Sequence, residues 1–331
     1  LRLLGLLAFK NNNHDIAEQL LIKAIRLDPY FHLLWDNLAK VFRVQNKLED
    51  SKKAFENLIK LDPSNNEAFV ALGTIYNKLA QYKDGINSYK KALKLNDNNP
   101  RVHLSMGHAL KTLGNRKECE DSYLQAIKLF PLSGEGYWSL ANLKTYKFND
   151  NQIEAMKSAT KEDMHEQEKI QMMFALAKAN ESNKNFQESF KYYRDGNWMQ
   201  RKTVEYNAEE NSKSIDLTID FFKQNKENLD FNSGIATEDP IFILGLPRAG
   251  STLLEQILSS HSMIEGTEEL HNIMTIGRRI RTSNDSKNYL NNLLELNKNN
   301  ISSYGNMYID ETRWARKENN FFIDKMPNNF P

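Results

Sequence analysis

The sequence predicts two folds in succession, an all-α solenoid of helical pairs followed by a truncated α/β domain with a parallel sheet. Two observations lead to this prediction. The N-terminal part of the chain repeats one pattern with the period of roughly 34 residues that is typical of helical pairs stacked into a solenoid. A stretch near residue 240 instead combines a buried strand, a glycine-rich turn and an amphipathic helix. We expect the solenoid over 1–200, a helical connector over 201–239 and the α/β domain over 240–331.

Residues 1 to about 133 carry four copies of one pattern. Pro29, Pro63 and Pro131 occupy the same place in their repeats, and Asp97 stands where the series lacks a proline. Three further series keep this interval, two of small residues and one of large residues: Gly5, Ala39, Gly73, Gly107; Ala17, Ser51, Gly85, Cys119; and Leu21, Phe55, Tyr89, Tyr123. Small residues let paired helices approach closely, and large ones fill the space to the next pair. The interval and the series are those of tetratricopeptide repeats.

The pattern weakens after residue 133. A fifth unit begins at 137–141 and loses the spacing, while a degenerate sixth fits between about Ile170 and Gln200. Such an array predicts a curved inner surface, the usual place for a peptide or a partner protein. The alternative is that the solenoid only carries or dimerises the rest of the chain. The following segment is charged and then amphipathic over 215–222, which predicts the helical connector.

The glycine-rich turn has the composition of a phosphate-binding loop. Gly245 and Gly250 enclose four residues, and Ser251 and Thr252 follow, so the spacing nearly fits a Walker A loop. Ser251, however, stands in place of the lysine that reaches the outer phosphates of a nucleoside triphosphate, and Arg248 is the cation of the loop. The helix after the loop would direct backbone N–H groups and its positive dipole end at a bound anion. We therefore expect a phosphate-bearing ligand other than a hydrolysed ATP or GTP.

The α/β domain should contain two more strands beside the first. The strand at 241–246 and the helix at 251–260 should be followed by a parallel strand near 263–265, because a right-handed crossover returns the chain to the same sheet. A third strand is expected at 321–324. In such sheets ligands gather outside the carboxyl ends of the strands. The residues that follow these three strand ends, and that we expect to meet there, are Arg248, Glu269 and Lys325.

The loop carries a resemblance to a known family. It resembles the P-R-[SA]-G-[ST]-T-L loop with which sulfotransferases hold the 5′-phosphosulfate of 3′-phosphoadenosine 5′-phosphosulfate (PAPS), and its residues are Pro247, Arg248, Ala249, Gly250, Ser251, Thr252 and Leu253. With its repeats, the whole chain resembles the bacterial tetratricopeptide-repeat sulfotransferases, whose catalytic half is similar to protein-tyrosine sulfotransferases. The resemblance implies transfer of a sulfuryl group from PAPS to a hydroxyl of a protein tyrosine or a carbohydrate, without a metal.

The resemblance also assigns roles to individual residues. Glu269 takes the place of the catalytic base, and Lys325 that of the lysine that assists at the transferring sulfate. Arg248, with Ser251 and Thr252, would hold the phosphosulfate. A carboxylate that accepts the proton of the hydroxyl assists the attack, and fixed cations stabilise the charge of the leaving phosphate. Glu268 is the competing candidate for the base.

Other readings of the domain stay open. The family's residues for the 3′-phosphate and adenine have no counterpart before Pro331, and the chain lacks an initiator methionine. We therefore expect a fragment cut at both ends that is inactive by itself. The cytoplasm is the expected compartment, with an upstream targeting signal left open. The alternatives are a P-loop nucleotide kinase or NTPase, which Ser251 disfavours, and a repeat scaffold with an inactive remnant, which the presence of Arg248 and Glu269 disfavours.

Composition excludes several other classes of protein. The 44 Lys and Arg residues against 43 Asp and Glu residues give a net charge of +1, which argues against a nucleic-acid binder held by bulk charge. The single cysteine, Cys119, excludes an internal disulfide and a cysteine metal cluster. The sequence contains no H-E-x-x-H or Cys/His spacing of a metal site. Its apolar runs are all shorter than the roughly 18 residues of a membrane span.

Overall fold

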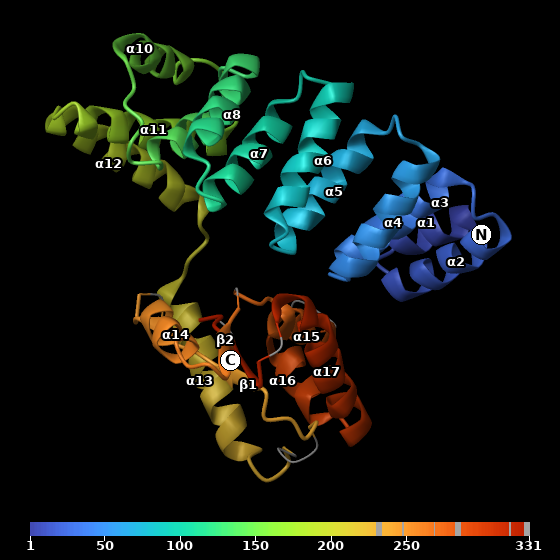
Figure 1. Cartoon of the computed structure of the whole chain (residues 1–331). Coiled ribbons are helices and arrows are strands. Elements are labelled where there is room, and N and C mark those ends of the chain that lie inside the picture. The colour runs from blue at the N-terminus through green and yellow to red at the C-terminus, as the bar shows by residue number, and fades with distance from the viewer. Residues whose placement is uncertain (230–233, 247, 268, 282–285, 318, 328–331) are drawn as a thin grey trace. The chain divides into compact units, whose positions relative to one another are not determined.

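The computed structural model describes residues 1–331 except 230–233, 247, 268, 282–285, 318 and 328–331. The chain divides into two compact units, Leu1–Glu205 and Tyr206–Pro331. All elements of the first unit are helices, and the second combines helices with a parallel sheet of three strands among the described residues (Figure 1). The predicted succession of a helical repeat solenoid and an α/β region is confirmed.

The first four repeats form four helical pairs. Their helices are α1 (Arg2–Lys10), α2 (His14–Leu27), α3 (His32–Val44), α4 (Leu48–Leu61), α5 (Asn66–Lys78), α6 (Tyr82–Leu95), α7 (Pro100–Thr112) and α8 (Arg116–Leu129). Each helix packs against the next one along the chain. Local chemistry fixes where some of them begin: the side chain of Asn99 caps α7 by accepting the N–H of Val102, and Pro100 occupies the first turn, where its missing N–H costs no helical hydrogen bond.

The small residues of the repeats lie against the large ones. A Cβ atom on Gly73 would come within 2.6 Å of the ring of Tyr89, and one on Gly107 would clash with the ring of Tyr123 in the same way. Both tyrosines are fully buried, at 1% and 0% exposure. The paired helices therefore approach so closely that glycine is required at both positions, because close-packed interiors leave no space for an added carbon.

An additional helix explains why the pattern weakens after residue 133. The helices of this region are α9 (Gly134–Ala141), α10 (Asp150–Ala159), α11 (Glu166–Ser182) and α12 (Phe186–Thr203). Helix α9 packs against α11, and α11 packs against α12, so α10 is inserted between two packing partners. Gly134 permits the contact between α9 and α11, because a Cβ atom there would collide with the backbone carbonyl of Glu168.

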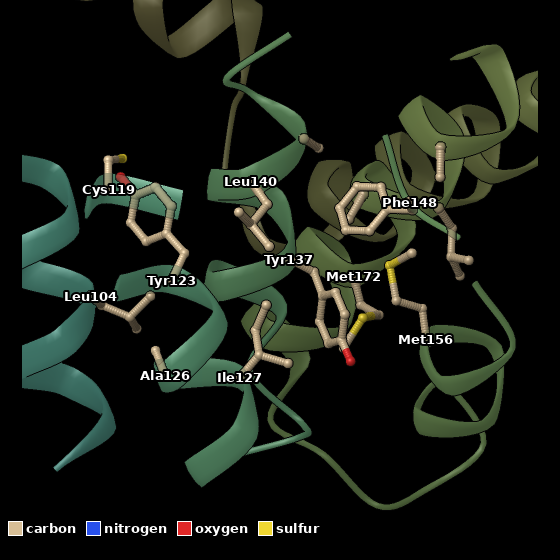
Figure 2. Packing of buried hydrophobic residues seen from close by; sticks show 14 of the residues in the cluster. Leu104, Cys119, Tyr123, Ala126, Ile127, Tyr137, Leu140, Phe148, Met156 and Met172 are labelled. Carbon is tan, nitrogen blue, oxygen red and sulfur yellow. The ribbon is translucent and has the colours of Figure 1, made fainter. Parts of the chain in front are cut away.

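The inserted helix contributes to the apolar core at this end of the solenoid. Figure 2 shows side chains of α8, α9, α10 and α11 gathered into one cluster. Fully buried members, each at 0% exposure, are Tyr123, Leu140, Met156 and Met172. The thiol of Cys119 belongs to the same cluster, and burial raises its pKa. Cys119 is therefore a packing residue, as a small buried side chain in the repeat register should be.

The second unit surrounds a small sheet. Its elements are α13 (Ala208–Gln224), β1 (Pro240–Phe242), α14 (Ser251–Ser259), β2 (Ile264–Gly266), α15 (Asn272–Ile280), α16 (Ser286–Leu294), α17 (Lys298–Glu311), a 3₁₀ turn (Arg313–Ala315) and β3 (Phe321–Asp324). The strands are parallel and lie in the order β1-β3-β2, so β3, the last of the described strands, is the central one. Phe322 on β3 is opposite Pro240 on one side and Glu265 on the other.

The strands at 264–266 and 321–324 and the helix from Ser251 confirm the sequence-based expectations, whereas the first strand differs. It was expected over 241–246 with both faces covered, but β1 ends at Phe242. Phe242 and Leu244 are 44% and 48% exposed, and Ile243 is 5% exposed. Coverage on both faces is therefore wrong for the described residues, among which β1 is an outer strand paired with β3 alone.

Helix α17 fixes the carboxyl end of β3. The hydroxyl of Tyr308 donates a hydrogen bond to Oδ2 of Asp324 at 2.8 Å, and both side chains are buried. Burial and the neighbouring Asp324 raise the pKa of Tyr308, so the phenol keeps its proton. The ring of Tyr308 also packs against Phe322 and Phe242. Because Asp324 is held in this way, the next residue, Lys325, leaves the sheet at a defined place.

Candidate functional site

Charged residues meet at the carboxyl edge of the sheet. Lys325 follows the central strand β3, and its ammonium nitrogen lies 3.1 Å from Oε1 of Glu269, which comes shortly after β2. The same nitrogen lies 3.6 Å from Oε2 of Glu255 on α14. The structure thus brings together two of the three residues that the strand-end argument placed here, and it adds Glu255 as a third member of the cluster.

The members of this cluster differ in exposure. The side chains of Lys325 and Glu255 are only 12% and 14% exposed, whereas that of Glu269 is 55% exposed. Burial acts to lower the pKa of Lys325, but its hydrogen bond to Glu269 and the charges of both carboxylates outweigh this effect and raise the pKa. Lys325 therefore carries a fixed positive charge near neutral pH, and Glu269 is the carboxylate that solvent can reach.

The glycine-rich loop turns sharply before α14. Arg248 has a φ of 70° and Gly250 a φ of 91°, both in the left-handed region. Glycine adopts this conformation without strain, whereas a non-glycine residue such as Arg248 does so at a cost that is often found at functional sites. Gly250 precedes the first residue of α14, and its carbonyl accepts the N–H of Leu254 at 3.1 Å.

The beginning of α14 offers backbone donors to an anion. Among the described residues, no side chain caps this N-terminus. The N–H groups of the first turn and the positive end of the helix dipole therefore suit a phosphate or sulfate. Most of the loop is accessible: Ala249, Gly250, Thr252 and Leu253 are exposed, and Ser251 is partly exposed.

The remaining predicted site residues have different outcomes. Arg248 lies in the loop with an exposed side chain, and the described contacts do not join it to the ion pairs of Lys325. Pro247, the first residue of the predicted loop motif, lies outside the described residues. The same holds for Glu268, the competitor of Glu269 as the base, so the choice between these carboxylates stays a prediction.

Sequence reasoning missed Glu255. Helix α14 was interpreted through its apolar face, yet Leu253 and Ile257 are 63% and 59% exposed while Glu255 points to the sheet edge. Gly266 makes room for it, because a Cβ atom there would lie 3.2 Å from Oε1 of Glu255. A signal was present in the sequence: Glu255 is one helical turn after Ser251, so it lies on the same face of the helix as the residue that follows the glycine-rich loop.

An apolar hollow of about 380 Å³ lies elsewhere in this unit. It is bordered by β1, α15, α17 and the segment before β1, with side chains such as Ile235, Phe242, Ile273, Ile301 and Ile309. Its described lining is mainly apolar and includes no carboxylate, imidazole, ammonium or guanidinium group, and its polar side chains are those of Thr237, Tyr304 and Tyr308.

Neither a metal cluster nor a membrane span is found in the described part of the chain. No three or more His, Cys, Asp and Glu side chains among these residues are grouped to hold a metal ion. None of the helices described here combines the length and the apolar character that crossing a lipid bilayer requires.

Comparison with known protein families agrees with the two folds. Residues 240–331 match the model of the sulfotransferase family. Residues 73–114 match a TPR repeat model, and residues 3–31 and 100–131 match a tetratricopeptide repeat model. The expected combination of tetratricopeptide repeats with a sulfotransferase-family domain at the C-terminal end is confirmed.

Individual relatives are more distant. An uncharacterized protein of Aquifex aeolicus (strain VF5) is 28% identical over 194 residues, which make up 57% of this chain and 26% of that protein. The match thus spans about a quarter of that relative. A crystal structure of MamA is 16% identical and covers 61% of this chain and 97% of its own, with a TM-score of 0.42. YrrB, described as a TPR protein with an unusual peptide-binding site, is 19% identical. It covers 55% of this chain and 92% of its own, with a TM-score of 0.43.

Proposed function

Because the chain carries tetratricopeptide repeats and a sulfotransferase-family domain, we propose that it serves a PAPS-dependent sulfotransferase reaction on a hydroxyl acceptor. The observation that supports this most directly is the pairing of Lys325 with Glu269 at 3.1 Å on the carboxyl edge of the sheet. A fixed cation and an accessible carboxylate are the two kinds of group that sulfuryl transfer to a hydroxyl needs. A protein tyrosine or a carbohydrate is the proposed acceptor.

The loop would bind the donor. Backbone N–H groups of 249–253 and the positive dipole end of α14 would face the 5′-phosphosulfate, with the hydroxyls of Ser251 and Thr252 as additional donors. Arg248 would add charge-assisted hydrogen bonds to the same group. Gly245 and Gly250 let the backbone come close to the ligand, because neither carries a Cβ atom.

The reaction would proceed by direct transfer. The acceptor oxygen forms a bond to sulfur while the bond between sulfur and the 5′-phosphate oxygen breaks, and the phosphate leaves with the bonding electron pair. The proton of the acceptor hydroxyl goes to the carboxylate of Glu269. Lys325 stabilises the negative charge at the transferring group. Glu269 and Lys325 contact each other here, so this ion pair has to separate before Lys325 acts on the sulfate and Glu269 on the acceptor.

Arg248→Ala tests the donor site. Loss of a charge-assisted hydrogen bond of about 1.5–3 kcal/mol should weaken binding of the inert product 3′-phosphoadenosine 5′-phosphate by roughly 10–150-fold. Calorimetry on the full-length protein measures this affinity. Arg313→Ala is the matched control, because Arg313 is 73% exposed in the same unit. Equal affinities of the wild type, Arg248→Ala and Arg313→Ala would show that Arg248 does not bind the donor.

The solenoid is proposed to bind the acceptor as a protein or peptide, since repeats of this kind present a curved surface to such partners. Deletion of residues 1–133, which removes α1 to α8, should then raise KM for a protein acceptor at least several-fold and leave donor affinity unchanged. Steady-state transfer of labelled sulfate from PAPS to tyrosine peptides and glycans measures KM. An unchanged KM for every acceptor would assign the repeats to assembly instead.

A further inference from the structure

The ammonium of Lys325 contacts two carboxylates of unequal exposure. Glu269 is the nearer one, at 3.1 Å, and is 55% exposed. Glu255 is at 3.6 Å and is only 14% exposed, about as deeply placed as Lys325 itself. The charged form of a carboxylate with so little access to solvent is stable only when a cation lies beside it. The carboxylate of Glu255 is therefore stabilised mainly by Lys325 and not by the solvent.

The fold holds Glu255 in place from two sides. It lies on α14, one turn after the phosphate loop, and α14 packs against β2. At the end of β2, Gly266 leaves the space that the carboxylate occupies, because a Cβ atom there would come within 3.2 Å of Oε1 of Glu255. Glu255 thus connects the end of β3, through Lys325, with the helix that begins at the loop.

The charge of the cluster suggests its purpose. A carboxylate beside a phosphosulfate site repels the ligand, so Glu255 can favour the reaction only through the cation that it holds. Glu255, Glu269 and Lys325 together carry a net charge of −1, from two carboxylates and one ammonium. Uptake of one proton by Glu269 makes this charge zero, which suits a group that must receive the proton of the acceptor.

We propose that Glu255 is a positioning residue that keeps the ammonium of Lys325 at the carboxyl edge of the sheet when Glu269 leaves it to accept the proton of the acceptor. This inference rests on the proposed sulfotransferase function. It assigns the two carboxylates different tasks: the buried one retains the cation, and the exposed one carries out proton transfer.

Chemical labelling of Lys325 tests, without any turnover, whether Glu255 retains the ammonium. The full-length protein is treated with an amine-reactive reagent between pH 7 and 10, and labelling of Lys325 is quantified by mass spectrometry. Glu255→Gln keeps the shape but removes one of the charges that raise the pKa of Lys325. The pKa should fall, and labelling at a fixed pH should rise roughly 3–10-fold, since one pKa unit is a tenfold change in free amine. Glu255→Asp keeps the charge and should stay closer to the wild type.

Two further variants serve as a graded change and as a control for this result. Gly266→Ala places a methyl group beside the carboxylate of Glu255 and should raise labelling by a smaller factor, about twofold, because the side chain can shift by tenths of an ångström. Glu295→Gln removes a charge from an exposed position in the same unit and should leave labelling unchanged. Thermal melting confirms that each variant is folded. Labelling of Lys325 that is equal in Glu255→Gln, Glu255→Asp and the wild type would overturn the proposal.

Kinetics tests whether retention of the ammonium by Glu255 assists sulfuryl transfer. In the full-length protein Glu255→Gln should lower kcat roughly tenfold, leave the affinity for 3′-phosphoadenosine 5′-phosphate within about twofold, and be partly rescued by Glu255→Asp. A lower kcat with unchanged labelling would mean that Glu255 only supports the structure, which contradicts positioning through Lys325. Absence of sulfuryl transfer by the wild type would instead refute the proposed function, while the labelling still decides whether Glu255 holds Lys325.

Discussion

Glu269→Gln is expected to reduce kcat for sulfuryl transfer by roughly 10²-fold or more, because it removes the proposed general base and general bases contribute about 10²–10⁴-fold. The amide keeps the size of the side chain, and its oxygen can still accept the hydrogen bond from Lys325 that Oε1 accepts at 3.1 Å. Affinity for 3′-phosphoadenosine 5′-phosphate should stay within about twofold of the wild type, because the carboxylate that is removed acts in the transition state and not in binding of this product.

Single-turnover transfer from labelled PAPS measures the chemical step, and calorimetry measures the affinity for the product. Glu268→Gln is the matched control, because the two carboxylates are adjacent in the sequence and only one of them should matter. If Glu268→Gln loses turnover while Glu269→Gln retains it, the base is Glu268. If both variants transfer sulfate at the rate of the wild type, general-base catalysis by either carboxylate is wrong.

Tyr123→Ala is expected to lower the free energy of unfolding of the solenoid by about 3–5 kcal/mol, the range for removal of a fully buried aromatic side chain. Tyr123 is 0% exposed, and its ring fills the space above Gly107, as the close approach of the two residues shows. The cavity left by alanine would be bordered by glycine on the opposite helix, so neighbouring side chains cannot fill it by a small shift.

Tyr123→Phe separates the ring from the hydroxyl. Phenylalanine keeps the ring and loses the interactions of the hydroxyl, which are the 2.9 Å contact with Nδ1 of His108 and those with Cys119 and Ser139, so the expected cost is about 0.5–1.5 kcal/mol. Urea unfolding followed by far-UV circular dichroism measures both variants. Repeats contact mainly their neighbours, so hydrogen exchange should show the loss concentrated around α7, α8 and α9. A cost for Tyr123→Ala as small as that for Tyr123→Phe would contradict the packing argument.

The repeats could be predicted from the sequence because their spacing is itself a packing requirement. Gly73 and Gly107 must be small since Tyr89 and Tyr123 occupy the space beside them, and both members of each pair recur with the period of the repeat. Helix α10 could not be predicted in this way. It has no counterpart in the four preceding repeats, and only the packing of α9 against α11 shows that it is an insertion.

Part of the candidate site could be predicted as well. The rule that carboxyl ends of parallel strands share one edge placed Glu269 beside Lys325, and the structure has them in contact. The rule says nothing about which side of α14 packs on the sheet. Spacing alone selected Leu253, Leu254, Ile257 and Leu258 as a common face, yet the first three are 63%, 47% and 59% exposed, and Leu258 is partly exposed. The orientation of α14 depends on its contact with β2, which is tertiary information.

The position of β3 in the middle of the sheet has a consequence for synthesis of the protein. Among the described residues β1 and β2 pair with β3 alone, so neither has this partner until β3 leaves the ribosome, and the segment 267–320 separates β2 from β3. At about 5–20 residues per second, translation of this segment takes roughly 3–11 s. During that time β1 and β2 present unpaired edges, which other nascent chains can join. Slower translation between β2 and β3 would therefore lower the yield of folded protein, whereas the solenoid, already synthesised by then and built from local contacts, would be unaffected.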